Sequence, residues 1–256
     1  MKIVIYTALT GGYDKLIQPS VIDKDFTYIC FSNDIKEKQV GVWEIRKFPI
    51  VINNAQQLSR YPKMHPYDLL ADYDYSLYID ANVKINDKYI YTRIRELIEQ
   101  NTVLAGMCHL EVDCAYEEGL RVLTSKRERN WKAVFNLMLY MRKNRFPYHW
   151  GMYEANCIFR DNHNKIVKSQ CDLWWTLFLK YAHRDQLSYS YTLWRFKLPF
   201  VYILPLGYNT RNHSSIIAGS HGASSSKTKK LIKKYMYKPT VFTIKIVLNL
   251  ITLFSK

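Results

Sequence analysis

The segment Tyr75-Ser76-Leu77-Tyr78-Ile79-Asp80-Ala81-Asn82 indicates the fold class more sharply than any other stretch of the chain. Its first five residues are mostly apolar or aromatic and predict a buried strand, and polar side chains follow at once. In layered α/β domains, ligands bind beyond the carboxyl ends of the strands. Asp80 and Asn82 therefore stand where a domain of this class would bind a ligand.

Strand and helix patterns alternate on both sides of that segment. Strand patterns cover residues 2–8, 26–31, 42–48, 103–108, 154–160 and 198–204, and helical patterns cover 88–100, 126–143 and 168–181. Residues 53–71 have a helical composition, but Pro62 and Pro66 predict short helical pieces with a break. The alternation predicts an α/β fold with a central sheet flanked by helices.

The positive charge of the chain is concentrated at its end. Lysine and arginine number 37 against 22 acidic residues, a net charge of +15, and residues 227–256 hold eight lysines and no acidic residue. We expect one folded domain over residues 1–225 and a basic, apolar tail over residues 226–256. Because the body is only mildly basic, the composition argues against a nucleic-acid partner.

The tail predicts attachment to a membrane surface. Residues 239–254 are apolar but interrupted by Lys245, and a secure span needs about twenty residues. The preceding Lys229-Lys230 and Lys233-Lys234 favour a helix lying on acidic headgroups; the alternative is a terminal helix docked on the domain. Residues 1–6 resemble a first strand rather than a signal peptide. We therefore expect a cytoplasmic protein, peripheral on the inner face of the cell membrane.

Asp80 and Asn82 are candidate metal ligands. Carboxylate and amide oxygens suit a divalent cation, and alternate residues leaving a strand can converge on one ion. Upstream, Arg60 and Lys63 could bind phosphate or carboxylate oxygens. Spacing alone also allows simpler interpretations, a strand-to-turn exit for the first pair and a solvated helical face for the second.

Several motifs, taken together and in order, resemble one family. They are Thr7-Ala8-Leu9-Thr10-Gly11-Gly12-Tyr13-Asp14, Tyr28-Ile29-Cys30-Phe31-Ser32, Trp43-Glu44-Ile45, Arg60-Tyr61-Pro62-Lys63, Tyr78-Ile79-Asp80-Ala81-Asn82, and His109 followed by Cys114-Ala115-Tyr116-Glu117-Glu118. This order is similar to a group of glycosyltransferase-like proteins of bacteria and plants, long catalogued as a domain of unknown function. The resemblance covers residues 1–215. It implies a GT-A fold, a Rossmann-like sheet with a nucleotide-sugar donor and usually a manganese or magnesium ion.

The resemblance also implies roles for the positions that match the donor-site motifs. These are Thr7, Ala8 and Tyr13 at the nucleotide base, Arg60 and Lys63 at the diphosphate, and Asp80 and Asn82 at the metal and ribose. The usual D-x-D of such enzymes is D-x-N here, so one carboxylate is missing. That difference weakens the expectation of strict metal dependence.

Two acids are candidates for the general base of an inverting transfer, which must take the proton of the acceptor hydroxyl. Glu154 lies in Gly151-Met152-Tyr153-Glu154-Ala155-Asn156, a stretch that faces the sugar and the acceptor in the resembling family. Asp185 lies in Arg184-Asp185-Gln186. Either could instead be a hydrogen-bonded acid at the end of a strand or helix, so both remain candidates.

Histidines and acids after two of the predicted strands complete the candidate site. His109, Glu117 and Glu118 could contact the acceptor or order the loop that does. His213 follows the last predicted strand, where GT-A enzymes often place a metal ligand, and a neutral imidazole would suit manganese. His221 is close by and is an alternative.

Two functions of different class are consistent with these patterns. In the first, residues 1–225 form a catalytic domain that moves a sugar from a nucleotide-diphosphate donor to a glycan or glycolipid acceptor in surface polysaccharide or lipopolysaccharide synthesis. In the second, the chain is a non-catalytic module that binds acidic membrane through residues 227–256, and Asp80-Ala81-Asn82 is only a turn.

Overall fold

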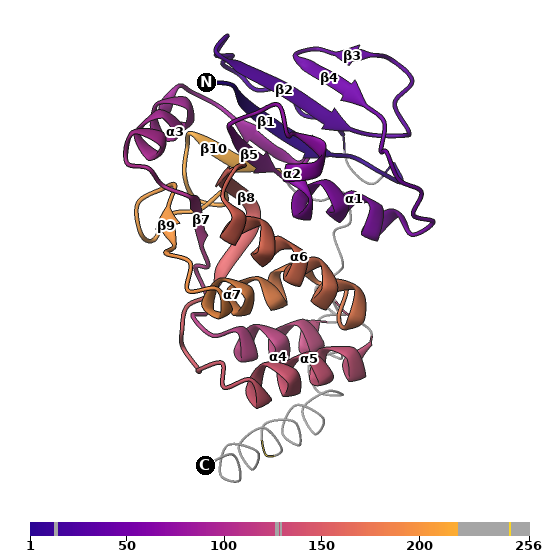
Figure 1. The fold of residues 1–256 in the computed structure, drawn as a ribbon, viewed down its shortest axis with the longest axis vertical. Helices are drawn as coiled ribbons and strands as arrows, with labels where there is room; N and C mark the ends of the chain where they lie inside the picture. The colour runs from indigo at the N-terminus through magenta and orange to yellow at the C-terminus, as the bar shows by residue number, and fades with distance from the viewer. Residues whose placement is uncertain (13–14, 126–127, 129, 220–245, 247–256) are drawn as a thin grey trace, which may run out of the picture.

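The structure, a computed structural model, describes residues 1–12, 15–125, 128, 130–219 and 246. Its centre is a mixed sheet of eight strands in the order β3-β4-β2-β1-β5-β8-β7-β9 (Figure 1). The strands are β1 (Ile3–Ala8), β2 (Phe26–Phe31), β3 (Gln39–Val40), β4 (Trp43–Arg46), β5 (Tyr75–Ile79), β7 (Leu104–Cys108), β8 (Tyr153–Asp161) and β9 (Val201–Tyr202). A second, two-stranded sheet pairs β6 (Val83–Ile85) with β10 (Ile216–Ala218).

Strand direction decides where the loops of the main sheet gather. β1 runs parallel to β2 and β5, β2 runs parallel to β4, and β7 runs parallel to β9. β8 is antiparallel to both β5 and β7. Every strand except β3 and β8 therefore ends at one edge, and β8 begins there. We call this the carboxyl edge.

Helices cover both faces of the sheet (Figure 1). They are α1 (Ala55–Met64), α2 (Pro66–Leu69), α3 (Tyr89–Glu99), α4 (Ala115–Ser125), α5 (Trp131–Lys143), α6 (Lys165–Lys180) and α7 (Asp185–Arg195). Ile3 and Ile5 of β1 join the core that packs against α3, whereas Val4 and Tyr6 join the core against α1, α2, α6 and α7. Alternate residues of one strand are thus buried on opposite faces, as in strands covered on both sides.

The helices α4 and α5 form a separate layer with α7 at the end of the molecule away from β3 and β4 (Figure 1). Met138 and Tyr191 are part of this apolar cluster. A Cβ atom added to Gly119 would lie 2.7 Å from Sδ of Met138. The absence of a side chain at Gly119 therefore lets α4 approach α5 closely.

Most of the predicted elements are present. The strand predicted over residues 26–31 matches β2, and the helix predicted over 88–100 contains α3. The break in the helical stretch lies at His65, which precedes Pro66 and leaves the helical region, whereas Pro62 is accommodated inside α1. Helices α4 and α7 and the short strands β3, β6 and β10 were not predicted.

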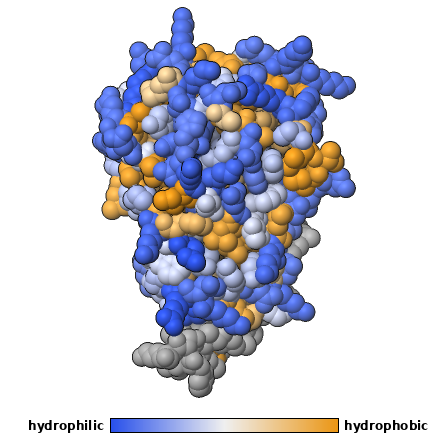
Figure 2. Space-filling view, viewed as in Figure 1, coloured by the Kyte–Doolittle hydropathy of each residue, from blue (hydrophilic) through white to orange (hydrophobic). Residues whose placement is uncertain are grey.

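The face seen in Figure 2 is mostly hydrophilic, with several separate hydrophobic patches. None of the helices among the described residues has the length and apolar character needed to cross a membrane. The proposed tail over 226–256 lies outside the described residues except for Ile246.

Candidate functional site

The carboxyl edge brings together candidate residues that are far apart in the sequence. Asp80 follows β5, His109 follows β7, and Glu154 lies at the start of β8. The backbone N–H of Asp80 donates to the carbonyl of Asn156 at 2.9 Å, which extends the pairing of β5 with β8 by one residue. Polar side chains from neighbouring strands therefore open onto one region, as the α/β pattern predicts.

A glycine turn follows β1 at this edge. Gly11 and Gly12 have φ values of +70° and +61°, a backbone region that glycine enters without strain. The N–H of Gly11 donates to Asp34 Oδ2 at 2.6 Å, which ties the turn to the segment after β2. Thr7 at the end of β1 is fully buried, and its hydroxyl has no hydrogen-bond partner among the described residues.

The predicted nucleotide-base residues are only partly placed by the structure. Thr7 and Ala8 are the last two residues of β1, and both are buried. Tyr13 lies outside the described residues. Their contact with a nucleotide base stays a prediction.

Two cations of α1 alternate with two carboxylates. Lys63 Nζ lies 2.6 Å from Asp185 Oδ2 and 3.1 Å from Asp80 Oδ1. Arg60 Nε, one helical turn earlier, lies 3.2 Å from the same Asp185 oxygen. The Lys63 side chain is only 1% exposed, and that of Arg60 is 27% exposed. The simpler sequence interpretation, a solvated helical face, is therefore wrong for Lys63.

Asp185 is held ionised by these two cations. Burial alone would raise the pKa of its carboxyl, but the charges of Lys63 and Arg60 hold that pKa well below its usual range. Trp174 Nε1 also donates to the Asp185 carbonyl at 2.7 Å, which fixes the start of α7. A carboxylate with so low a pKa has little affinity for a proton, so Asp185 is the weaker of the two candidate bases.

The side chain of Asp80 does not bond its own backbone, as an Asp that only shapes a turn would. The turn itself is made by the main chain, where Val83 N–H donates to the Asp80 carbonyl at 2.8 Å. The contacts that described residues make with the Asp80 carboxylate fall on Oδ1, from the Tyr78 hydroxyl at 2.8 Å and from Lys63. Burial raises the pKa of Tyr78, so its hydroxyl stays a donor. The Asp80 side chain is 30% exposed, which leaves it accessible to a ligand.

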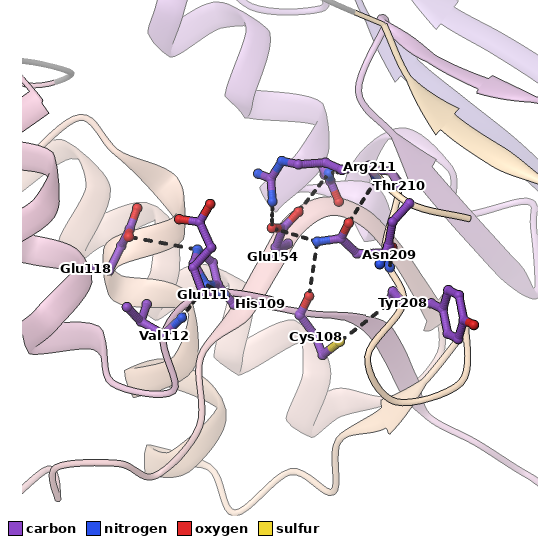
Figure 3. A network of polar contacts seen from close by, with 12 residues as sticks. Cys108, His109, Glu111, Val112, Glu118, Glu154, Tyr208, Asn209, Thr210 and Arg211 are labelled. Atoms are coloured by element: carbon purple, nitrogen blue, oxygen red, sulfur yellow. Dashed lines mark hydrogen bonds and ion pairs between the residues drawn. The ribbon is translucent and has the colours of Figure 1, made fainter. Parts of the chain in front are cut away.

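Glu154 is a buried acid held by three donors (Figure 3). Its side chain is 1% exposed. Asn156 Nδ2 donates to Oε2 at 3.1 Å and Asn209 Nδ2 donates to Oε1 at 3.0 Å, while the Arg211 guanidinium also pairs with Oε1. Burial raises the pKa of Glu154 above its usual value, although Arg211 lowers it in part. The negative charge of Asp80 raises the pKa of Glu154 further, which shows that the two carboxylates are close enough to interact electrostatically.

The loop after β9 is built to hold Glu154. The N–H of Arg211 donates to Asn209 Oδ1 at 2.8 Å, which turns the amide nitrogen of Asn209 toward Glu154. The same loop is anchored by the Asn209 N–H, which donates to Asn212 Oδ1 at 2.8 Å. His213 was predicted as a site residue in this segment, whereas Asn209 and Arg211 were not. The run of polar residues 209–213 after β9 was the feature of the sequence that could have indicated them.

His109 orders the loop after β7 (Figure 3). Its Nδ1 accepts backbone N–H groups of Glu111 at 3.2 Å and Val112 at 3.1 Å, which places the ring proton on Nε2. That Nε2 lies 3.8 Å from Glu118 Oε2, and both side chains are buried. Glu117 is exposed on the first turn of α4. The contacts support the loop-ordering interpretation of His109; contact with an acceptor stays a prediction.

The remaining candidate metal ligands have partners of their own. His213 lies between the rings of Tyr89 and Tyr208, with centroid distances of 5.3 Å and 5.4 Å. Its Nδ1 accepts the N–H of Ser215 at 3.2 Å. Asn82 Nδ2 donates to the carbonyl of Gly219 at 3.0 Å.

These residues fit a divalent metal ion poorly. Within the part of the chain that the structure describes, no three His, Cys, Asp or Glu side chains gather as a metal site. Asp80, whose side chain is 30% exposed, already shares Oδ1 with the Lys63 ammonium. Two like unit charges about 4 Å apart repel by roughly 4 kcal/mol at an effective dielectric constant near 20, and a divalent ion doubles that. An ion on Asp80 would therefore compete with Lys63.

Comparison with known proteins identifies the family of the chain. No curated protein matches it. A family model described as TOD1/MUCI70, glycosyltransferase-like domain, matches residues 1–211. The matched region contains the whole main sheet, the helices α1 to α7, and the residues around Asp80 and Glu154. The chain belongs to the TOD1/MUCI70 glycosyltransferase-like domain family.

Proposed function

We propose that the chain moves a sugar from a nucleotide-diphosphate donor to a glycan or glycolipid acceptor in surface polysaccharide or lipopolysaccharide synthesis. The observation that carries the proposal is that Asp80 and Glu154 both lie at the carboxyl edge. Asp80 is partly exposed and pairs with Lys63 of α1, whereas Glu154 is buried and has a raised pKa. Such a division separates a donor-binding acid from a proton-accepting acid.

The donor half of the site uses Arg60 and Asp80. When the sugar leaves, negative charge grows on the diphosphate, and fixed cations that face this charge lower the barrier. Arg60 has an exposed portion, and a guanidinium can bind phosphate oxygens with two parallel hydrogen bonds. Asp80 would accept a hydrogen bond from a hydroxyl of the ribose or of the transferred sugar. The resemblance also implies a divalent ion here, but the contacts of Asp80 favour cations of the chain itself.

The acceptor half uses Glu154 as general base. A raised pKa brings a carboxylate closer to the operating pH and makes it a better proton acceptor. The Arg211 guanidinium pairs with Oε1 of Glu154, and the Arg211 side chain is 53% exposed. Arg211 must therefore move away from Oε1 before an acceptor hydroxyl can approach that oxygen.

Ligand-induced stabilisation tests the donor half. A ligand that binds only the folded state raises the unfolding midpoint, by about 2.7 kcal/mol of stability at one hundred times its dissociation constant. Nucleoside diphosphates and nucleotide sugars should be screened against the full chain. We expect one nucleotide class to raise the midpoint, and Arg60→Ala to abolish that rise. A midpoint that no nucleotide diphosphate moves would contradict the proposal and favour a non-catalytic module.

The tail supplies the proposed location. Residues 227–256 carry eight lysines, and each basic residue near an acidic membrane contributes about 1 kcal/mol of attraction. We propose that these residues hold the enzyme on the inner face of the cell membrane, beside a lipid-linked acceptor.

A further inference from the structure

We propose that the ammonium of Lys63 takes the place of a divalent metal ion at Asp80, so that the donor diphosphate departs without a bound metal. The inference rests on the proposed function and names the cation that works in the donor half of the site. Lys63 Nζ lies between Asp80 Oδ1 and Asp185 Oδ2, at 3.1 Å and 2.6 Å. A metal ion could also bridge two carboxylates in this way, but here the bridging cation is a side chain of α1.

The surroundings of Lys63 fix its position. The side chain is 1% exposed, and Nζ lies 4.7 Å from the centroid of the Tyr78 ring, a cation–π distance. The Tyr78 hydroxyl donates to the same Asp80 oxygen that Lys63 contacts. An ammonium held from three directions in this way cannot be exchanged with solvent or removed by a chelator.

The charges of the cluster support the same conclusion. Arg60 and Lys63 carry two positive charges, and Asp80 and Asp185 carry two negative charges, so the four side chains balance. The D-x-N sequence provides one carboxylate fewer than D-x-D, which lowers the affinity for a divalent ion. Asp185, which is 122 residues from Lys63 in the sequence, supplies a second carboxylate to the cluster. This carboxylate accepts a hydrogen bond from the Lys63 ammonium.

In the proposed transfer, the bond between the anomeric carbon and the diphosphate oxygen breaks, and its electron pair stays on that oxygen. The acceptor oxygen forms the new bond to the anomeric carbon, and its proton passes to Glu154. The added negative charge on the diphosphate faces Arg60, with Lys63 next to it in the same cluster. Positively charged side chains fixed before the reaction can supply this stabilisation.

The first test measures hydrolysis or transfer by the full chain after exhaustive treatment with EDTA, with the assay run in EDTA and in manganese. We expect rates that differ by less than about twofold, whereas an enzyme that uses a Lewis-acid metal loses that stabilisation. Activity that disappears in EDTA and returns with manganese would overturn the inference while leaving the proposed function intact.

The second test needs no turnover, so it keeps the inference separate from the proposed function. Manganese alone is titrated into the untagged chain, and bound ion is followed by electron paramagnetic resonance. We expect no binding that depends on Asp80 in the wild type. In Lys63→Ala we expect a new manganese site between Asp80 and Asp185, which is lost again in the double variant with Asp80→Asn.

A matched control and a folding control accompany that titration. Lys168 pairs with Asp68 at 3.4 Å on the surface, so Lys168→Ala also removes a lysine from a carboxylate but should create no manganese site. If Lys63→Ala does not fold, manganese binding by the wild type and by Asp80→Asn still tests the inference. Manganese bound by the wild type and released by Asp80→Asn would show that Lys63 does not replace the ion.

Discussion

Lys63 Nζ lies 2.6 Å from Asp185 Oδ2, although the two residues are 122 positions apart in the chain. The contact joins α1 to the first residue of α7, and through Asp80 it reaches the end of β5. Both partners are buried, so each charge must be compensated inside the protein, by the other partner and by Asp80 and Arg60. In the proposed function, the same contact would therefore serve both the donor site and the stability of the fold.

Asp185→Asn is expected to destabilise the fold. Breaking a buried ion pair on one side costs about 3–5 kcal/mol, and the loss here should be near 3 because Lys63 keeps Asp80 as a partner. Denaturant unfolding at neutral pH measures the change. Asp172→Asn, an exposed position on α6, is the control and should change stability by less than about 0.5 kcal/mol. Equal unfolding midpoints for the wild type and Asp185→Asn would mean that the pair contributes nothing.

The Asp185 carboxylate should also make the stability of the fold depend on pH. The folded-state pKa of Asp185 lies well below its usual value, because Lys63 and Arg60 outweigh the effect of burial. The stability that the ionised Asp185 contributes is fully present above its unfolded-state pKa of about 4, and it is lost as the pH falls through the folded-state pKa. The stability difference between wild type and Asp185→Asn should therefore narrow below about pH 4. Denaturant unfolding at a series of pH values tests this, and a difference that grows with acid would contradict it.

Arg211→Ala is expected to shift the pH dependence of transfer. Arg211 lowers the pKa of Glu154, so its removal should raise that pKa further. A general base acts in its deprotonated form, and the acidic limb of kcat/KM should therefore move to higher pH. Arg195→Ala, at the last residue of α7, is the comparison and should leave the limb in place. A limb unchanged by Arg211→Ala would mean that Glu154 is not the base.

Deleting residues 227–256 is expected to release the protein from vesicles that contain acidic lipid. The eight lysines of this segment supply an attraction that salt screens. Transfer to a soluble acceptor should continue in the deletion variant, since residues 1–211 match the family. Co-sedimentation with acidic and neutral vesicles measures the effect. Undiminished binding to acidic vesicles would place the membrane contact elsewhere.

Local patterns were enough to predict most strands of the main sheet and the position of Asp80 at the end of one of them. Strand 26–31 and the strand before Asp80 follow from residue type, because strands buried on both faces are rich in apolar and aromatic residues. The gathering of loops at one edge follows from parallel strands. The break before Pro66 also follows from local chemistry, since a residue that precedes proline avoids the helical region.

The partners of the site residues could not be predicted in the same way. Asp185 meets Lys63 only because α1 and α7 pack on the same face of the sheet, and that packing depends on many contacts between distant residues. Arg211 meets Glu154 only because β9 lies beside β7 at the end of the strand order. Residue spacing carries no information about such pairs. The opposite pKa shifts of Glu154 and Asp185 therefore could not be predicted from the sequence.

The most direct test of the account is a screen of nucleotide sugars for hydrolysis by the wild type and by Asp80→Ala, with Asp172→Ala as control. We expect the wild type and the control to hydrolyse one nucleotide class. We expect Asp80→Ala, still folded by its thermal midpoint, to be slower by about 10² or more, as for other lost electrostatic groups. Hydrolysis by Asp80→Ala at the wild-type rate, or no hydrolysis of any nucleotide sugar by the wild type, would contradict it.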